Sequence, residues 1–282
     1  PAIQRLRFVT SYPRDFGDDA LEVMRDCPRI CRYLHVPAQS GSDRILRAMN
    51  RGYTIDQYDE FLARARAILD QPEIGRPLTV SGDIIVGFPS ETDEDFDATV
   101  ALLRRARYKN CFIFKYSPRP GTPAYDRLED DVPEEVKRRR NNALLAIQSE
   151  ISDQISAEQV GREFDVMVEG VSRRTQKATG ATKATLRKQH AVAGGVALTI
   201  RGRSQAGDAP SHACGTGVAE PPNANAPDAS PSEVLQLSAR TDGDLIVFFA
   251  APAADAEALI GTIQRLRITH ADRLSLHATL LA

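Results

Sequence analysis

The sequence predicts an α/β fold for the first part of the chain and a small all-β barrel for the second. Apolar runs of strand length alternate with helical patterns over residues 1–159, which is typical of a βα barrel with parallel strands. Short alternating strands dominate residues 160–282, where a basic and then apolar-poor insertion lies at about 171–232. We therefore expect two domains with these boundaries, the first of them a partial, four-stranded barrel.

Four segments of the first domain read as buried parallel strands, each followed by a turn and a helical pattern: residues 5–11, 33–39, 80–87 and 111–117. The third is the clearest, because the string D-I-I-V-G-F-P-S-E at 83–91 is an apolar run that stops on Gly-Phe-Pro. In parallel sheets, the loops at the carboxyl ends of the strands hold the ligands. We expect the functional site at that edge.

The helices between these strands are predicted from apolar spacing and from capping residues. After the second strand, one apolar face is formed by Ile55, Tyr58, Phe61, Leu62, Ala65, Ile68 and Leu69. Thr92 and Asp95 have capping-box spacing at the start of the next helix. Its apolar stripe consists of Phe96, Thr99, Val100 and Leu103. A long last helix opens at Asp131, Val132 and Pro133, and its inward residues are Leu144, Ile147, Ile151 and Ile155.

Four parallel strands are too few for a closed barrel, which takes about eight strands on this plan. The first predicted strand begins four residues after Pro1 and would expose an apolar edge, which natural domains cover. We therefore expect the first strands of this domain to be absent from the sequence. The alternative is a small open sheet that begins here.

Composition excludes few classes of protein. A hydrophobic content of 42% is sufficient for packed cores, and a formal net charge of −2 points to no particular partner. The sequence has no apolar stretch near the ~20 residues that span a bilayer, and no leader-like start at Pro1. Its four cysteines are scattered, unlike a disulfide framework, so we expect a reducing cytoplasm. Because no stretch is long and apolar enough to span a bilayer, we expect no membrane partner.

The second domain reads as five short strands at 163–170, 235–238, 244–249, 261–269 and 274–281, with a Thr-Asp-Gly-Asp turn at 241–244. This pattern predicts a small closed barrel of the RNA-binding kind, and the alternative is a barrel used only for packing. Between 171 and 203 lie eight Lys or Arg residues and no Asp or Glu. The following stretch, 202–233, is too poor in large apolar residues to be ordered, and we read it as a flexible loop.

Two of the cysteines resemble part of an iron–sulfur motif. Cys27 and Cys31 match the first two positions of C-x-x-x-C-x-x-C, but the third position is Leu34. A three-thiolate cluster cannot lose one ligand, so we interpret both cysteines as structural. Cys111 falls in a predicted strand and Cys214 in the apolar-poor loop. No metal site is predicted in this sequence.

Four long strings resemble the radical-SAM methylthiotransferases: T-S-Y-P-R-D-F at 10–16, the run L-H-V-P-A-Q-S-G-S-D-R-I-L-R-A-M-N-R-G-Y-T at 34–54, D-I-I-V-G-F-P-S-E-T at 83–92, and K-Y-S-P-R-P-G-T-P-A at 115–124. The resemblance is closest to the MiaB type, which converts N6-isopentenyladenosine at position 37 of tRNA to its 2-methylthio derivative. It runs from about residue 5 to 169 as the radical-SAM barrel. It resumes at 235 as the OB-like TRAM domain of that family.

Within this group, the sister enzyme that methylthiolates N6-threonylcarbamoyladenosine-37 in tRNA is the main alternative, because it shares more of the strings at 39–42 and 116–121 than the ribosomal-protein-modifying relatives do. A second alternative is a tRNA-binding module without chemistry. The stretch 171–232 departs from the family, where the first two TRAM strands lie closer together.

The resemblance implies a larger enzyme that uses S-adenosyl-L-methionine and two 4Fe-4S clusters, whose ligands are not in this chain. In the family, one S-adenosylmethionine yields a 5′-deoxyadenosyl radical that attacks C2 of the adenine, and another supplies the methyl group for the inserted sulfur. The implied partners are the tRNA anticodon stem-loop and the missing N-terminal half of the same enzyme. We expect the chain alone to be inactive, with no catalytic residue of its own.

The resemblance and the strand ends together suggest which residues bind. The candidates for S-adenosylmethionine are Gln39, Ser40, Ser42, Gly87, Phe88, Pro89, Tyr116 and Ser117. Gly87 would let an adenine approach the backbone, with Phe88 and Pro89 as walls. The alternative for each is ordinary packing at a strand end. The candidates for RNA are Arg119, Arg173, Arg174, Lys177, Lys183, Arg187 and Lys188. His35 is interpreted as a core histidine or as one that supports a site residue from behind. The basic run 137–140 is interpreted as a solvated helix face, and the alternative is contact with tRNA.

The cysteine pattern gives a direct prediction. Anaerobic reconstitution of this chain with iron and sulfide should yield no 4Fe-4S absorbance, because the third thiolate position is Leu34. A stoichiometric cluster that disappears in Cys27→Ser would contradict the interpretation, and Cys111→Ser is the matched control.

Overall fold

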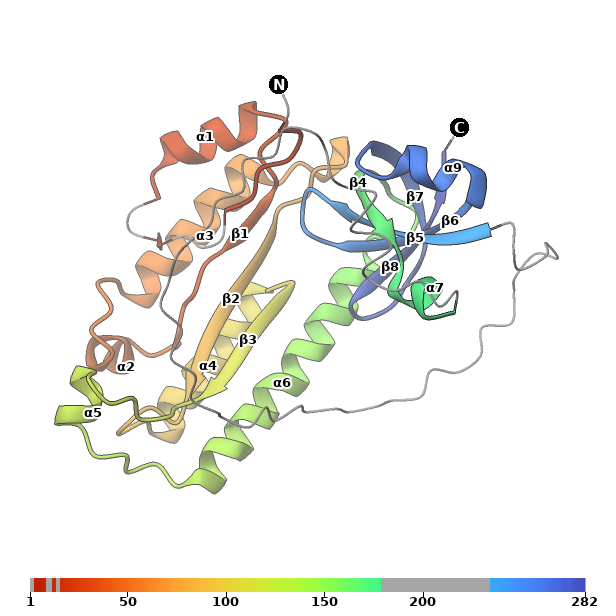
Figure 1. Ribbon diagram of the computed structural model, residues 1–282. Helices are drawn as coiled ribbons and strands as arrows, with labels where there is room; N and C mark the ends of the chain where they lie inside the picture. The colour runs from red at the N-terminus through yellow and green to blue at the C-terminus, as the bar shows by residue number, and fades with distance from the viewer. Residues whose placement is uncertain (1–2, 9–11, 14–15, 179–233, 282) are drawn as a thin grey trace, which may run out of the picture.

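The computed structural model describes residues 3–8, 12–13, 16–178 and 234–281, which form an α/β sheet region and a β-barrel (Figure 1). The first region contains α1 (Asp18–Asp26), β1 (Tyr33–His35), α2 (Asp43–Ala48), α3 (Ile55–Leu69), β2 (Thr79–Val86), α4 (Asp93–Ala106), β3 (Asn110–Lys115), α5 (Pro123–Arg127) and α6 (Glu134–Ala157). The second contains β4 (Glu163–Val171), α7 (Arg173–Ala178), β5 (Val234–Thr241), β6 (Ile246–Pro252), α9 (Ala253–Leu259), β7 (Ile263–Ala271) and β8 (Ser275–Leu280).

The sheet of the first region is parallel, in the order β1-β2-β3. Its register pairs His35 with Ser81 and Ser81 with Asn110, so the three strands run side by side and end at one edge. The prediction of parallel strands at 33–39, 80–87 and 111–117 is confirmed. β1 is shorter than predicted, although an isolated parallel bridge between Gln39 and Ile84 continues the pairing beyond it.

The predicted strand at 5–11 is wrong for the part of it that the structure describes, residues 5–8. Only Leu6 pairs there, in a single parallel bridge to Ile30. Its N–H donates to the Arg29 carbonyl and its own carbonyl accepts from the Cys31 N–H. No other residue of 5–8 pairs with this segment. The described sheet therefore has three strands rather than four.

The predicted helices are confirmed, and α4 begins at its expected cap. Thr92 and Asp95 form a reciprocal capping box at the start of α4, and Thr54 and Gln57 form one at the start of α3. The α3 residues that face the core are Ile55, Tyr58, Phe61, Leu62, Ala65 and Leu69. Leu144 and Ile151 of α6 belong to the same buried cluster.

The two faces of the sheet differ. Leu34, Val80 and Ile84 point into the core shared with the helices. Strand alternation puts Phe112 and Phe114 on the opposite face, where each is 53% exposed and their rings stack with centroids 6.4 Å apart. Large aromatic side chains are usually buried, so an exposed pair on a sheet face marks a surface that a ligand or partner can contact.

The second region is a closed barrel in the order β4-β5-β6-β8-β7, in which β4 also pairs with β7. The predicted five-stranded barrel is therefore confirmed, including the turn that follows β5. Alternate residues of every strand fill its interior, among them Phe164, Leu237, Val247, Leu266 and Leu276. Most of the predicted insertion, 179–232, lies outside the described residues.

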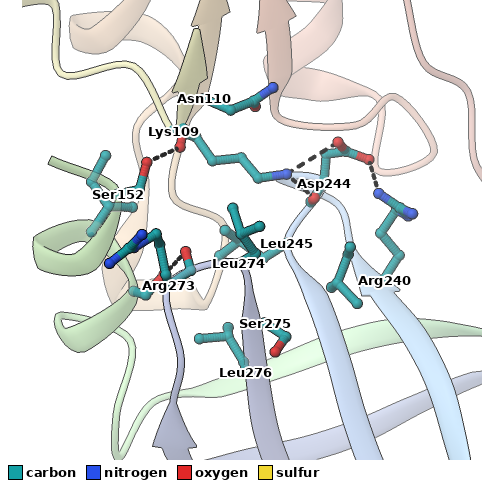
Figure 2. A pocket seen from close by; sticks show the side chains of 13 residues that line it. Lys109, Asn110, Ser152, Arg240, Asp244, Leu245, Arg273, Leu274, Ser275 and Leu276 are labelled. Atoms are coloured by element: carbon teal, nitrogen blue, oxygen red, sulfur yellow. Dashed lines mark hydrogen bonds and ion pairs between the residues drawn. The ribbon is translucent and has the colours of Figure 1, made fainter. Parts of the chain in front are cut away.

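The turn between β5 and β6 joins the barrel to the amino end of the sheet. Asp242 accepts from Arg76 Nε at 2.9 Å. Thr79, the first residue of β2, donates its hydroxyl to the Gly243 carbonyl. Asp244 lies 3.1 Å from Lys109 Nζ and 2.9 Å from Arg240 Nη1, as Figure 2 shows beside a cavity of about 240 Å³. Arg7 also pairs with Asp244, at 3.0 Å. One carboxylate thus serves cations from both regions.

Asp244 should therefore contribute strongly to stability. Burial opposes its ionisation, but the cations Lys109, Arg240 and Arg7 outweigh burial and lower its pKa. Asp244→Ala should reduce the free energy of unfolding by about 2–3 kcal/mol, somewhat less than for a fully buried pair, because it leaves cations without their anion. Urea titration checks this, with Glu257→Ala on the exposed face of α9 as the control. Equal stability of the two variants would contradict the role assigned to Asp244.

Candidate functional site

The candidate site lies at the edge of the sheet where the three strands end. The chain leaves β1 through Gln39, β2 through Gly87 and β3 through Tyr116. The Tyr116 N–H donates to the Val86 carbonyl at 2.8 Å, and the Gln39 N–H to the Asp83 carbonyl at 2.8 Å. These backbone bonds bring three of the predicted cofactor residues to one edge.

The turn after β2 has an unusual backbone. Gly87 has φ +70°, and Ser90 has φ +68°, a left-handed conformation that a serine rarely adopts. Phe88 is 5% exposed, and its ring meets the Tyr116 ring edge to face at 5.0 Å. Pro89 is buried beside it. The backbone of residues 87–90 therefore lies next to the packed rings of Phe88 and Tyr116.

Gly87 is required here for a reason that the sequence did not reveal. A Cβ at this position would lie 2.3 Å from Cγ of Lys137, whose side chain from α6 fills that space. Lys137 is 3% exposed; its Nζ lies 5.4 Å from the Tyr116 ring centroid and pairs with Asp130. Because Lys137 occupies that side of Gly87, any ligand would have to approach the turn from another direction.

The expectation that the run 137–140 is solvated is wrong for two of its members. Lys137 and Arg140 are buried, at 3% and 4% exposure, whereas Arg138 and Arg139 are exposed. Residues three apart share one face of a helix, and this face of α6 is turned toward the β2 turn. The spacing of the two buried cations was the only sequence signal for this arrangement.

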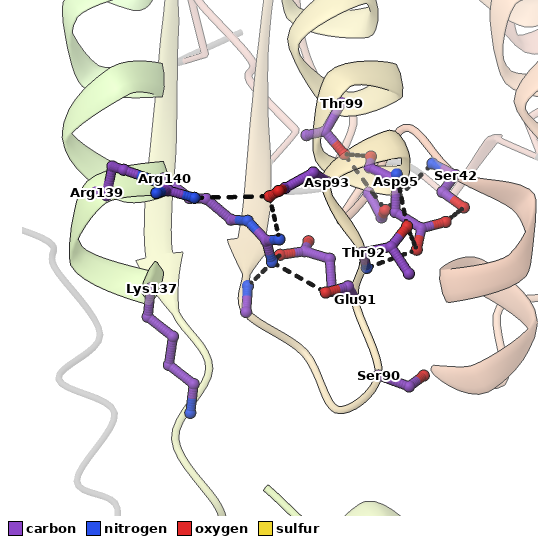
Figure 3. Close-up of polar contacts among 12 residues, drawn as sticks. Ser42, Ser90, Glu91, Thr92, Asp93, Asp95, Thr99, Lys137, Arg139 and Arg140 are labelled. Carbon is purple, nitrogen blue, oxygen red and sulfur yellow. Dashed lines mark hydrogen bonds and ion pairs between the residues drawn. The ribbon is translucent and has the colours of Figure 1, made fainter. Parts of the chain in front are cut away.

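A buried ion pair holds the turn, as Figure 3 shows. The Glu91 carboxylate accepts from the Gly87 N–H at 2.6 Å and from Arg140 Nη1 at 2.7 Å. Arg140 Nη2 also donates to Asp93 at 2.8 Å. Burial raises the pKa of Glu91, while the Gly87 N–H and Arg140 act in the opposite direction. Neither Glu91 nor Arg140 was singled out as a site residue in the sequence.

Ser40 and Ser42 face α4 rather than the edge. The Ser42 hydroxyl donates to Asp95 at 2.5 Å, and Ser40 Oγ lies 3.5 Å from Thr99 Oγ1 (Figure 3). Arg44 also donates to Asp95. Their side chains already have protein partners, so of this segment only Gln39, which is 7% exposed with φ +70°, lies where the strands end. The packing alternative accounts for both serines in this structure.

The remaining candidates lie on the loop after β3 or in the barrel region. Ser117 directly follows Tyr116, and both Ser117 and Arg119 are exposed. Arg173 and Arg174 are exposed on α7, in the barrel region, and Lys177 is in the same short helix. Lys183, Arg187 and Lys188 lie outside the described residues. The cations proposed for RNA are therefore not gathered with the cofactor candidates.

His35 and the cysteines take structural positions. Nδ1 of His35 lies 2.8 Å from the Ser81 hydroxyl and Nε2 lies 3.4 Å from Asp83. Cys31 is buried, Cys27 is half-buried, and burial raises the pKa of the Cys111 thiol well above its usual range. Among the residues that the structure describes, no three His, Cys, Asp or Glu side chains are grouped so as to hold a metal ion. No described helix is long and apolar enough to cross a membrane.

Comparison with known proteins finds a family model and a solved structure that match part of this chain. Residues 1–103 match the family model of the Radical SAM superfamily. A solved structure, coproporphyrinogen III oxidase from Escherichia coli, titled a radical SAM enzyme, is 22% identical; the match covers 54% of this chain and 33% of that one, with a TM-score of 0.43.

Curated relatives narrow the class. The chain is 50% identical over 176 residues to tRNA-2-methylthio-N(6)-dimethylallyladenosine synthase of Rhodopirellula baltica, covering 62% of this chain and 36% of that protein. It is 47% identical to the synthase of the same name from Phocaeicola vulgatus (61% and 37% covered) and 46% identical to that from Acetivibrio thermocellus (65% and 37%). The chain thus spans little more than a third of the length of these relatives. The resemblance to radical-SAM methylthiotransferases of the MiaB type is confirmed.

The Asp95 cluster gives a pH-dependent prediction. Burial opposes ionisation of Asp95, but hydrogen bonds from Arg44, Ser42 and Thr92 outweigh it and lower its pKa. A lowered carboxyl pKa adds stability above the unfolded value of about 4, and this contribution is lost as the pH falls further. Asp95→Asn should therefore cost about 1–3 kcal/mol at pH 7 and progressively less as the pH falls from 5 toward 2.

Chemical unfolding at several pH values checks this, with Asp97→Asn on the exposed face of α4 as the matched control. A difference between wild type and Asp95→Asn that stays constant with pH would contradict the ionised cluster.

Proposed function

We propose that this chain is part of a radical-SAM tRNA methylthiotransferase that acts on N6-isopentenyladenosine in the anticodon loop. The observation that carries the proposal is the convergence of Gln39, Gly87, Phe88 and Tyr116 at the carboxyl edge of a parallel sheet. Ligands bind at such edges in α/β folds. The names of the relatives supply the reaction, since the edge alone is compatible with many ligands.

The residues at the edge fit the adenosine part of S-adenosylmethionine. Tyr116, which is half-buried, offers aromatic surface for a purine, and the buried Phe88 ring supports it edge to face. The Gly87 turn offers backbone groups, and the Gln39 amide can both donate and accept hydrogen bonds. When bound, S-adenosylmethionine supplies the radical and methyl-transfer chemistry. The task of these residues is to bind and orient it.

The cysteines do not fit an iron–sulfur cluster. The spacing that begins at Cys27 and Cys31 meets Leu34, and Cys111 is a buried thiol of β3. We therefore assign no step to a cluster within this chain. The proposal places the cluster ligands in a part of the enzyme that the chain does not include.

The open face of the sheet suits the adenine of the RNA. Phe112 and Phe114 are exposed on it, and the His35 ring lies 6.3 Å from the Phe112 ring. A nucleobase stacks favourably on such rings, with about 1–3 kcal/mol per base. Asp83 and His35 could then contact the polar edge of the base. This face adjoins the edge proposed for S-adenosylmethionine. A base stacked on it would therefore lie next to the cofactor, as a reaction between the two requires.

The barrel would bind the RNA backbone as a TRAM domain. Support for this comes from its closed five-stranded form and from the exposed Arg173 and Arg174 beside it. Lys177, Lys183, Arg187 and Lys188 would add sequence-independent affinity through phosphate contacts. A tRNA substrate would also place the protein in the cytoplasm.

Binding of an anticodon stem-loop that carries N6-isopentenyladenosine tests the proposal. Phe112→Ala combined with Phe114→Ala should weaken binding roughly tenfold or more, because a stacked base is lost. Val23→Ala, which removes an exposed apolar group from α1, should leave the affinity unchanged.

The same titration with a stem-loop that carries N6-threonylcarbamoyladenosine tests the sister substrate. Tighter binding of that RNA would favour the sister reaction. Equal affinity of the double variant and wild type for both RNAs would remove the sheet face from the proposal.

A further inference from the structure

The Glu91–Arg140 pair connects α6 to the backbone N–H of Gly87, the first residue of the turn after β2. We propose that Glu91 is a positioning residue, held by Arg140, that sets the Gly87–Phe88 turn in the shape required to bind an adenosyl group. This inference rests on the proposed function, because it assumes that the edge binds S-adenosylmethionine. It assigns a role to Glu91 and Arg140, neither of which is among the site residues predicted from the sequence.

The turn cannot hold its shape by backbone preference alone. It contains two residues with positive φ, Gly87 and Ser90, and only the first is a glycine. A left-handed serine costs free energy that the surroundings must offset. Hydrogen bonds to the turn do so: Glu91 N–H to the Phe88 carbonyl at 2.9 Å, Gly87 N–H to the Glu91 carboxylate, and Ser90 N–H to Asp131 at 2.7 Å. Arg44 also donates to the Ser90 carbonyl at 2.6 Å.

Of these bonds, the one from Gly87 is made to a buried charge. The Glu91 side chain is fully buried, and its Oε2 accepts from both the Gly87 N–H and Arg140 Nη1. A hydrogen bond to an ionised acceptor in such surroundings is about twice as strong as a neutral one. It fixes the direction of the Gly87 N–H and, through the peptide plane, the position of Phe88.

The pair is poorly satisfied for a purely structural element. Oε1 of Glu91 and Nε of Arg140 are both buried and have no hydrogen-bond partner within the described residues. Buried ion pairs of this kind are often no more stable than well-packed apolar residues. The Gly87 N–H and Arg140 Nη1 both donate to Oε2 of Glu91. Arg140 therefore holds the same oxygen that fixes the direction of the Gly87 N–H.

Arg140 links this position to the rest of the fold. It also donates to the Glu91 carbonyl at 3.1 Å and to Asp93, and its guanidinium lies over the Phe96 ring at 5.6 Å. These contacts tie it to the start of α4 as well as to the turn. The structural alternative is that the pair only docks α6 on α4, and that alternative predicts no effect on ligand affinity.

The test uses Glu91→Gln, which keeps the shape and an acceptor oxygen but removes the charge. S-adenosylhomocysteine, which contains adenine, ribose and an amino-acid end, is the probe. Its dissociation constant should rise about tenfold in Glu91→Gln, measured well below the melting temperature. Asp93→Asn, which removes the charge of another carboxylate bonded to the same Arg140, should leave the dissociation constant unchanged.

The turn can be observed independently of the ligand. Labelling valine at the carbonyl carbon and glycine at nitrogen selects Val–Gly pairs, and the sequence contains two, at Gly87 and Gly161. The Gly87 amide proton should lie far downfield in wild type and move upfield in Glu91→Gln. The Gly161 signal, from an N–H bonded to the Ile268 carbonyl at 2.8 Å, should stay in place.

Each outcome decides a different statement. If the Gly87 amide signal moves upfield and the affinity for S-adenosylhomocysteine falls in Glu91→Gln, Glu91 positions the turn. If wild type binds the probe and Glu91→Gln binds it equally well, the pair only docks α6 and the inference is wrong while the proposed function stands. If wild type does not bind the probe at all, the assignment of the edge to an adenosyl group is wrong, and the inference is wrong with it.

Discussion

The parallel pairing of β2 with a neighbour on each side is the constraint on which the candidate site depends. Because β1, β2 and β3 run in one direction, Gln39, Gly87 and Tyr116 must all leave the sheet at the same edge. The helices cover one face, so the other face, with Phe112 and Phe114, stays open next to that edge. A cofactor at the edge and a planar substrate on the face would therefore be neighbours.

Contacts between carboxylates and cations hold the sheet at both of its ends. At the amino end, Asp244 accepts from Lys109, Arg240 and Arg7 and joins the barrel to the sheet. At the carboxyl end, Glu91 and Arg140 join the β2 turn to α6. Each carboxylate sits where a backbone turn meets another element, so each fixes an orientation that apolar packing would leave less defined. The barrel thus docks at the end of the sheet opposite the candidate site.

The sequence was sufficient to predict elements whose signals are local. The Thr92 and Asp95 capping box, the apolar face of α3 and the alternation of the barrel strands depend on residues a few positions apart, and all three are confirmed. The strand at 5–11 was predicted wrongly because a strand needs a partner, and the only partner residue of the described part is Ile30. Lys137 and Arg140 were misread as solvated because their burial depends on the β2 turn, which is distant in sequence. Local patterns could place Gly87 in a turn, but only the packed structure relates it to Lys137.

A crystal structure of this chain with S-adenosylhomocysteine would show directly where the adenosyl group binds. The expected position of the adenine is the carboxyl edge of the sheet, in contact with Phe88 and the Gly87 turn, with Gln39 within hydrogen-bonding distance of the ligand. The ligand at the opposite end, in the cavity lined by Lys109, Ser152 and Arg273, would contradict it.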